Sequence, residues 1–416
     1  MSTSQAADPA TAADLLIVAD RLFDGRAGHV GPGGHAVAIR DGRIIETGAA
    51  ADLVARHPDA AVDRYEDATI SPGLIDAHVH LTMPGDGSPY ERGAGQPMEV
   101  RFLRARMNLR AHLEAGVTCV RDLGSHADFL DWDPDDAKFY PRLIRYGVPI
   151  TAERGHMFLF GGGVASAAEA RSAVERNLAA GADGVKIASS GGGTAGTIPH
   201  ARTIDQEIVS SAVATAHDHG VLATTHALSL DTMRDAILAG TDGIEHLGFL
   251  DDNGTSQFSA ELADLAIERG VTFGSTLGCN ERFLSSELLS VEDPVEFREQ
   301  GERTAYYISN ADELRRRGAR IAPASDAGWK YTHFGDFSNE LRLMRLAGYS
   351  AVDVLHLATA FNASYLQIDD QVGTLDTGKV ADIAVFSGNP LEDTADTQRT
   401  KAVYRQGVRS HFTPFV

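Results

Sequence analysis

The sequence predicts an α/β protein with a central (β/α)8 TIM barrel and β-rich segments at both ends. Between residues 69 and 371, short apolar strands alternate with helical segments, and the pattern supplies eight strands. Such alternation is typical of βα units that form a parallel barrel. The 416 residues, 43% of them hydrophobic, are enough for a barrel core and a second, smaller domain.

The barrel strands are expected at 74–79, 117–122, 148–151, 184–188, 221–226, 242–246, 271–275 and 320–326. Helices are expected at 99–114, 205–219 and 294–317. The first of these helices is followed by Gly116, a residue type that commonly caps helix ends.

The terminal segments contain short strands with glycine-rich turns. Strands are expected at 15–19, 36–39 and 43–45 near the start, and at 373–375, 378–386, 402–404 and around 408 near the end. Asp41-Gly42 between two apolar runs predicts a β-hairpin.

Composition excludes several classes of protein. A net charge of −21 disfavours binding to nucleic acid or to an anionic membrane. Two cysteines, Cys119 and Cys279, form no disulfide framework and indicate a reducing, cytoplasmic compartment. The first residues show no signal-peptide pattern, and no apolar run is long enough to span a bilayer.

The most informative stretch is Ile-Ser-Pro-Gly-Leu-Ile-Asp-Ala-His-Val-His-Leu, residues 70–81. In a strand, residues two apart point to the same face, so His78 and His80 project together from its end. Two adjacent imidazoles make half of a metal site. The alternative for an isolated pair is that hydrogen bonds satisfy both rings in the core.

Functional residues of such barrels lie at the carboxyl ends of the strands. Six polar residues occupy these positions: His78, His80, Lys186, His226, His246 and Asp326. Any one of them can be structural, but six of suitable type at six suitable places form a specific pattern.

This pattern resembles the amidohydrolase superfamily of metal-dependent hydrolases, and the resemblance covers nearly the whole chain. It is closest to the branch with imidazolonepropionase-like proteins, prolidases and ochratoxin-amidase-like enzymes. The resemblance implies a β-sandwich domain built from 1–68 and 372–416, beside a catalytic barrel domain of 69–371. It implies structural roles for Lys379 and Asp382 near the final strands.

The resemblance also implies a binuclear metal site, most simply of zinc, although manganese, cobalt and iron suit the same ligands. His78, His80 and Asp326 would hold the more buried ion, and His226 and His246 the more exposed one. Lys186 would bridge the ions after carbon dioxide adds to its neutral amine, since an ammonium group cannot ligate a cation. The alternatives are a plain lysine that binds substrate, or a mononuclear site.

The implied reaction is attack of a metal-activated hydroxide on a carbonyl carbon. Asp326 would act as general base and then general acid. His156 follows Arg154-Gly155, where the family has a Gly-Gly-His segment, and would donate a hydrogen bond to the oxyanion. A structural role for His156 is the alternative.

The remaining histidines carry weaker signals. His126 lies in a loop and is expected behind the site or on the surface. His112, His217 and His219 lie in expected helices and have structural roles. His200 and His333 lie in loops near the barrel mouth, where they are candidates for substrate contact.

The substrate signal is mainly apolar. Leu228 stands where the prolidase-like branch carries an aromatic residue, and it cannot hydrogen-bond a substrate carboxylate. Two loops supply large apolar residues, which form a pocket or simply pack the loops: Trp329, Tyr331 and Phe334, and Met157, Phe158 and Phe160.

We therefore expect hydrolysis of an amide, carbamate or related acyl C–N bond in a largely apolar small molecule. Candidates are an N-acyl amino acid, a dipeptide-like compound or a xenobiotic aryl amide. An esterase or lactonase on the same site is the main alternative. A mononuclear deaminase would carry a glutamate near Ala227 and Leu228, and a non-catalytic scaffold would lack ligands. A homo-oligomer is expected because the family often forms one.

Overall fold

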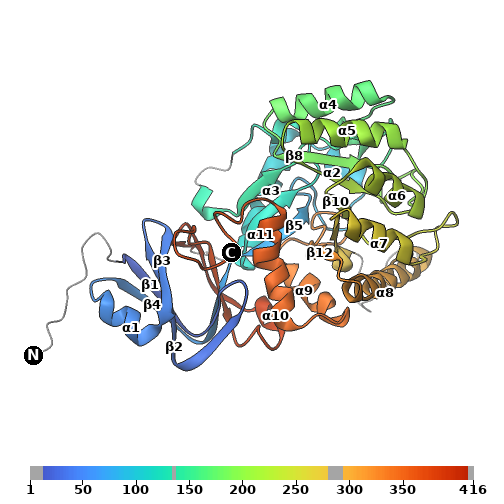
Figure 1. Ribbon diagram of the computed structural model, residues 1–416. Helices are drawn as coiled ribbons and strands as arrows, with labels where there is room; N and C mark the ends of the chain where they lie inside the picture. The colour runs from blue at the N-terminus through green and yellow to red at the C-terminus, as the bar shows by residue number, and fades with distance from the viewer. Residues whose placement is uncertain (1–12, 134–136, 280–293, 411–416) are drawn as a thin grey trace, which may run out of the picture.

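The computed structural model describes residues 13–133, 137–279 and 294–410 (Figure 1). A smaller β-rich part lies at one side, and a larger part of mixed strands and helices makes up the rest. The first residues, in which no signal peptide is expected, lie outside the described ranges. No helix in these ranges is long and apolar enough to cross a membrane.

The β-rich part is one mixed sheet with the strand order β15-β14-β13-β4-β1-β2-β3. Its strands are β1 (Leu15–Phe23), β2 (Gly28–Arg40), β3 (Arg43–Ala49), β4 (Ala61–Pro72), β13 (Ile383–Ser387), β14 (Thr400–Arg405) and β15 (Val408–Arg409). The expected hairpin is confirmed, because Arg40 pairs with Arg43 across Asp41 and Gly42. Both turn residues have positive φ, 51° and 73°, as a tight hairpin turn requires.

The expected β-sandwich stays a prediction, and among the described residues the strands of both ends form one continuous sheet. The reason is β4, which pairs in parallel with β1 and antiparallel with β13 and so joins the N- and C-terminal strands by hydrogen bonds. The sheet curls, since Val37 and Val385 share one core and the amide of Ala381 donates to the carbonyl of Gly42 at 2.9 Å. The helix α1 (Ala50–Arg56) follows β3 directly.

Three expectations for the C-terminal segment have clear outcomes. No strand forms at 373–375; Leu375 donates only a single backbone hydrogen bond to Asp24. Lys379 bonds to the carbonyl of Val372 at 3.3 Å. Asp382 is buried and forms an ion pair with Arg405.

The larger part contains two parallel sheets. One has the order β5-β6-β7, and the other has the order β12-β11-β10-β9-β8. The strands are β5 (Leu74–Val79), β6 (Val117–Asp122), β7 (Arg142–Arg145), β8 (Gly184–Ala188), β9 (Leu222–His226), β10 (Gly243–Glu245), β11 (Thr272–Gly274) and β12 (Arg320–Ala322). Isolated parallel bridges join the two sheets at both margins: Val79 with Ala327, and Ile150 with Ile187.

The third strand differs from the prediction. It was expected at 148–151, but β7 ends at Arg145 and only single bridges form at Ile150 and Thr151. Gly147 lies between them with a φ of 63°, and Pro149 has no N–H to donate. The ladder therefore stops after β7 and resumes briefly at Ile150, where it reaches β8.

Helices cover the outer side of these sheets (Figure 1). They are α2 (Tyr90–Ala94), α3 (Met98–Glu114), α4 (Ala167–Ala179), α5 (Gln206–Asp218), α6 (Leu230–Ala239), α7 (Ala260–Glu268), α8 (Pro294–Arg316), α9 (Phe337–Leu346), α10 (Ala351–His356) and α11 (Asn362–Tyr365), with a π-helical turn at Leu357–Phe361. Short 3₁₀ turns lie at Ala127–Phe129, Ala137–Phe139, Phe158–Phe160 and Thr394–Gln398. The three helices expected from sequence are α3, α5 and α8. Leu109 of α3, Met233 of α6 and Ala263 of α7 share the main hydrophobic core with Phe273 of β11.

Candidate metal centre

One cavity gathers all six residues that the sequence singled out as metal ligands. Its lining includes His78, His80, Lys186, His226, His246 and Asp326. These residues come from β5, β8, β9 and the segments just after β5, β10 and β12, so the carboxyl ends of distant strands meet at one place. All six side chains are buried.

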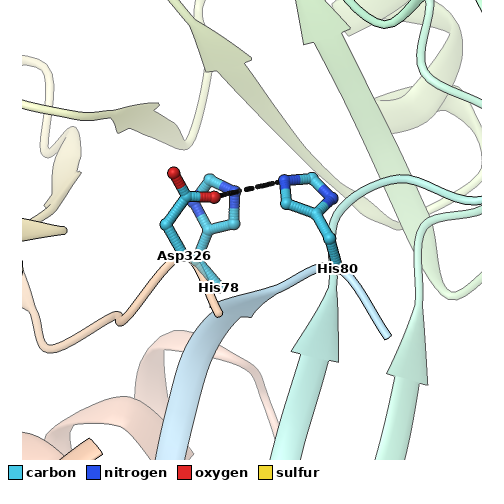
Figure 2. Close-up of side chains that lie close together, drawn as sticks. All are labelled: His78, His80 and Asp326. Atoms are coloured by element: carbon cyan, nitrogen blue, oxygen red, sulfur yellow. Dashed lines mark hydrogen bonds and ion pairs between the residues drawn. The ribbon is translucent and has the colours of Figure 1, made fainter. Parts of the chain in front are cut away.

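His78, His80 and Asp326 form the tightest group (Figure 2). The two Nε2 atoms of the histidines lie 3.2 Å apart. Asp326 Oδ1 lies 3.4 Å from Nε2 of His78 and 3.3 Å from Nε2 of His80. These three ligand atoms are close enough to share one ion.

The hydrogen bonds of the two histidines fix the position of their protons. Nδ1 of His80 faces the carbonyl of Gly124 at 3.4 Å, and Nδ1 of His78 faces a Glu245 oxygen at 2.9 Å. Both partners accept hydrogen bonds, so each Nδ1 carries the hydrogen and each Nε2 presents a lone pair. Burial lowers the pKa of His78, which keeps the ring neutral.

Asp326 completes the group as a carboxylate. Burial acts to raise its pKa, but His78 and His80 together hold it below the ordinary value. This lowering requires a proton on the histidines. When both rings are neutral, three lone pairs converge, and a cation among them would take the place of that positive charge. The chemistry of this donor set fits a divalent metal ion.

His226 and His246 lie beside this group. Their ring centroids are 4.7 Å apart, and the rings of His78 and His246 are 5.4 Å apart. Nε2 of His226 donates to the carbonyl of Gly191 at 2.8 Å, which leaves the lone pair on Nδ1. Burial lowers the pKa of His226 to about 3, so the imidazole is neutral and able to ligate.

Lys186 is a fully buried lysine in the same cavity. Burial lowers its pKa to about 8, although Glu245 and Asp326 act in the opposite direction. More of its amine is therefore neutral near neutral pH than in an exposed lysine, and addition of carbon dioxide requires the neutral form.

Two of the six residues have strained backbones. His246 and Asp326 have φ values of 74° and 61°, in the left-handed region that residues other than glycine rarely adopt. Each follows its strand by one to four residues. Strain of this kind persists where a side chain must be aimed into a site.

Glu245, which precedes His246, is a buried carboxylate that accepts hydrogen bonds beside the site. One carboxylate oxygen accepts from His78; the other accepts from Arg121 at 2.9 Å and from Thr224 at 2.6 Å. Burial raises its pKa, but the charge of Arg121 outweighs this effect and holds the pKa well below the ordinary value. Glu245 does not stand out in the sequence, where its place beside a strand-end histidine is the available signal.

Asp76 is a second buried carboxylate that holds residues beside the candidate ligands, and it does not stand out in the sequence. One of its oxygens accepts the backbone N–H groups of His78 at 3.2 Å and Ser325 at 3.0 Å. The other accepts from Nε2 of His112 at 3.1 Å. Asp76 thus joins the backbones next to two candidate ligands, and His112 has the structural role expected of it.

His156 lines the cavity, and its ring centroid is 4.5 Å from that of His226. Its Nδ1 lies 2.9 Å from the hydroxyl of Thr194, which also accepts from the backbone N–H of Met157 at 3.0 Å. Thr194 can donate its own hydrogen to Nδ1, and the ring then carries its proton on Nε2.

The other histidines lie away from the cavity lining. His126 packs edge-on against Phe160, at 5.0 Å between ring centroids. His217 bonds to Asp242 at 3.0 Å near the surface. His200 and His333 line separate, outer clefts, so the expected substrate contact is not seen for either in the central cavity.

Only some of the large apolar residues of these loops line the central cavity. Met157, Leu228 and Trp329 line the central cavity. Tyr331 lines an adjoining cleft, which shares Trp329 with the cavity. Phe334 instead packs against His112, with 4.8 Å between the rings, because its loop turns back toward α3.

The wall of the cavity also includes Cys279, Arg303 and Tyr307, which the sequence does not mark as residues of the site. Arg303 and Tyr307 are four residues apart, so a helical face was visible in the sequence, but nothing showed which face meets the cavity. Burial raises the pKa of Cys279 well above its ordinary value, so this cysteine is a thiol and a poor nucleophile. Cys119 is also buried, and neither cysteine forms a disulfide.

Comparisons with known proteins agree with this architecture. The amidohydrolase family matches residues 69–409, and the imidazolonepropionase-like composite domain of bacteria matches residues 36–60. The chain is 25% identical to an uncharacterized protein of Mycobacterium tuberculosis, over 89% of this chain and 90% of that protein. It is 24% identical to ochratoxinase of Aspergillus niger, over 88% of this chain and 80% of that enzyme.

A solved structure of a Xaa-Pro dipeptidase with methionine in its active site superposes with a TM-score of 0.80. The two chains are 25% identical, and the match covers 96% of this chain and all of the other. Together with the family match over most of the chain, this similarity shows that the protein belongs to the amidohydrolase family and is a hydrolase of carbon–nitrogen bonds.

Proposed function

We propose that the protein is a binuclear metal-dependent hydrolase that cleaves an amide, carbamate or related acyl C–N bond in a largely apolar small molecule. The observation that carries this proposal is the convergence of three lone pairs, from His78, His80 and Asp326. The family generally uses divalent metals, which agrees with this donor set.

In this proposal His78, His80 and Asp326 hold the more buried ion, and His226 and His246 hold the other. Lys186, as a carbamate, would offer the ions a further carboxylate group. When bound, such ions supply a nucleophile at neutral pH and polarise a carbonyl group. Zinc suits these nitrogen and oxygen ligands, as do manganese, cobalt and iron.

The chain's own residues then move and stabilise charge. Asp326 accepts a proton from the attacking nucleophile and later delivers it to the leaving amine. His156, whose neutral ring carries its hydrogen on Nε2, donates a hydrogen bond to the oxygen on which negative charge develops. Trp329 and Met157 keep water away from the apolar part of the substrate.

We also propose that the two parallel sheets close into a (β/α)8 barrel. The bridges of Val79 with Ala327 and of Ile150 with Ile187 support closure at both margins. A division into 69–371 and a domain of the two ends stays a prediction, and β4 would run across its first boundary. A cytoplasmic location and a homo-oligomeric state also stay predictions.

The substrate proposal draws on the names of two relatives. The Xaa-Pro dipeptidase is named for a dipeptide, and ochratoxinase for a toxin. Leu228 in this cavity favours an apolar group where a dipeptide would need a hydrogen bond.

Asp326→Asn tests the proton transfer. The variant keeps the shape of the side chain but cannot act as a base, so we expect turnover to fall by about 10²-fold or more while much of the bound metal remains. Metal analysis and steady-state kinetics measure the two quantities. Asp218→Asn, at an exposed aspartate at the end of α5, is the control and should match the wild type. Wild-type turnover in Asp326→Asn would exclude this role.

Lys186→Ala tests the carbamate. We expect activity to be lost and partly restored by short carboxylic acids, because they supply the missing bridging oxygens. Lys401→Ala, on the β-rich part, should be active without any addition. Retained metal with no response to formate, acetate or propionate would contradict the carbamate.

Metal content separates the remaining alternatives. About two ions per chain are expected for the binuclear hydrolase, and about one for a deaminase. A screen of the metal-loaded protein against N-acyl amino acids, aryl carbamates, aryl ureas and lactones then separates an amidase from an esterase or lactonase.

A further inference from the structure

The central cavity has a cationic lining that the proposed reaction does not use fully. Arg303 is a cationic lining residue to which the proposed reaction gives no role, whereas Asp326 and the carbamate proposed for Lys186 are anionic. The chain as a whole has a net charge of −21. Metal ions bound among the histidines would add further positive charge. Two divalent ions and Arg303 would outweigh the two anionic groups, so the metal-loaded cavity favours entry of an anionic ligand.

Arg303 and Tyr307 form one wall of this cavity and both come from α8. They are four residues apart, so their side chains lie on the same face of the helix. Tyr307 is almost fully buried, at 3% exposed, and Arg303 is partly buried. Arg303 and Tyr307 thus line the cavity side by side.

Within the described part of the chain, no carboxylate forms an ion pair with Arg303. The groups that act on it there are Tyr306, Tyr307 and Cys279, none of which is negatively charged at neutral pH. An arginine is always protonated, and a partly buried guanidinium without a counter-ion is costly. A ligand with an anionic group would remove this cost on binding.

We infer that Arg303 and Tyr307 bind a carboxylate of the substrate, so that the substrates are N-acyl amino acids and not neutral carbamates or ureas. This inference rests on the proposed function, since it assigns one end of the molecule cleaved at the same site. The planar fork of the guanidinium matches both oxygens of a carboxylate, and the phenol adds a third donor.

The assignment also explains how a cavity with several apolar wall residues can select an amino-acid derivative. Leu228 cannot hydrogen-bond a carboxylate, and it stands close to the candidate metal ligand His226. Arg303 supplies that function from another element, at the edge where the cavity adjoins an outer cleft that contains Tyr306. Leu228, Met157 and Trp329 remain as the apolar surface for the rest of the substrate.

The first experiment compares turnover of N-acetyl-L-phenylalanine with that of its uncharged carboxamide by the metal-loaded protein. We expect the wild type to prefer the acid by about 10- to 100-fold in kcat/KM, as for hydrogen bonds to a charged group. Arg303→Met should abolish this preference, mainly through KM for the acid. Arg303→Lys should keep part of it, because a lysine retains the charge but not the fork. Tyr307→Phe should weaken it less than Arg303→Met.

The matched control is Arg316→Met. Arg316 lies on the same helix, its side chain is 60% exposed, and it pairs with Asp312 outside the cavity. Arg316→Met removes one positive charge from the same helix, as Arg303→Met does, and should leave the preference for the acid unchanged. An acid preference that persists in Arg303→Met would overturn the inference.

The second experiment measures binding without turnover. Hydrocinnamate and the matching alcohol, neither of which has a bond to hydrolyse, are titrated into the metal-loaded proteins by calorimetry. We expect the wild type to bind hydrocinnamate about 10- to 100-fold more tightly than the alcohol, and Arg303→Met to lose the difference. Equal affinity in the wild type overturns the inference, as does tight hydrocinnamate binding that Arg303→Met leaves unchanged, because the carboxylate would then lie on the metals.

The two experiments separate the two proposals. If the carboxamide and the acid are both cleaved but Arg303 does not discriminate, the hydrolase stands and the carboxylate site falls. If neither is cleaved but the hydrocinnamate preference depends on Arg303, the carboxylate site stands and the amide reaction falls.

Discussion

At the scale of single residues, the orientation of the candidate ligands depends on buried partners. Glu245 holds the Nδ1 proton of His78 and neutralises Arg121, which also donates to the carbonyl of Ala77 at 2.6 Å. Arg121 and Glu245 are both completely buried. A carboxylate behind a metal-binding histidine fixes its tautomer and increases its basicity.

Glu245→Gln should therefore act on both stability and metal binding. It leaves the buried charge of Arg121 without a counter-ion, and we expect the free energy of unfolding to fall by about 3 to 5 kcal/mol. We expect metal affinity to fall by about 10- to 100-fold. Urea unfolding and metal titration measure these quantities.

The control is Glu261→Gln, whose side chain is 76% exposed and pairs with Arg234. Such surface pairs contribute little, so stability should change by less than about 1 kcal/mol. If Glu245→Gln changed stability no more than this control, the buried pair would not have the role described.

At the scale of elements, a buried carboxyl group connects α9 by hydrogen bonds to the segment that follows β11. Glu340 of α9 accepts from the hydroxyl of Ser275 at 2.5 Å and from the backbone N–H groups of Leu277 at 3.0 Å and Gly278 at 2.7 Å. Burial nevertheless raises its pKa from 4.5 to about 8. The folded protein therefore retains a proton that the unfolded chain releases.

This difference predicts a pH dependence of stability. Between about pH 4.5 and 8 the native state binds more protons than the unfolded state at Glu340, so the free energy of unfolding falls as pH rises, by at most about 1.4 kcal/mol per pH unit. Above pH 8 this contribution is constant. Glu340→Gln should remove this slope, as measured by urea unfolding across the range.

Glu313→Gln, at a glutamate whose side chain is 42% exposed, should keep the wild-type slope. A wild-type slope in Glu340→Gln would show that the carboxyl group is already ionised in the folded protein.

The positions of individual strands and helices were the feature of the fold that local sequence signals predicted best. β5, β6 and β8 have the expected bounds, because each is a short apolar run next to glycine, proline or polar residues. The third strand was misplaced, because the prediction relied on apolar residues at 148–151 and neglected the missing N–H of Pro149. The sequence did not show that β4 pairs with both β1 and β13 and so joins the strands of the two ends in one sheet.

At the scale of the whole molecule, the candidate metal centre joins strands that are far apart in the sequence. His78 and Asp326 are separated by more than half of the chain, and they meet because the backbone of Asp326 donates to the carbonyl of His78 at 2.9 Å. Ions held by residues from β5, β9 and the ends of β10 and β12 would therefore link most of the larger part of the fold.

Metal removal should lower the thermal stability of the protein. A ligand at 100 times its dissociation constant stabilises the native state by about 2.7 kcal/mol. A chelator should therefore lower Tm, and returned zinc, manganese or cobalt should restore it. In the double variant of His78→Ala and His80→Ala, the chelator should have a much smaller effect. A Tm that is equally sensitive in that variant would place the stabilising ion elsewhere.

The sequence by itself determined the class of the fold, most strand and helix positions and the six candidate ligands, because apolar periodicity and strand-end residues are local signals. It did not determine the supporting residues Asp76 and Glu245 or the wall formed by Arg303 and Tyr307. Their roles depend on which side chains meet across elements, and a sequence contains no direct record of that packing. Only the tertiary structure decided that one face of α8 brings a cation to the same cavity as the candidate metal ligands.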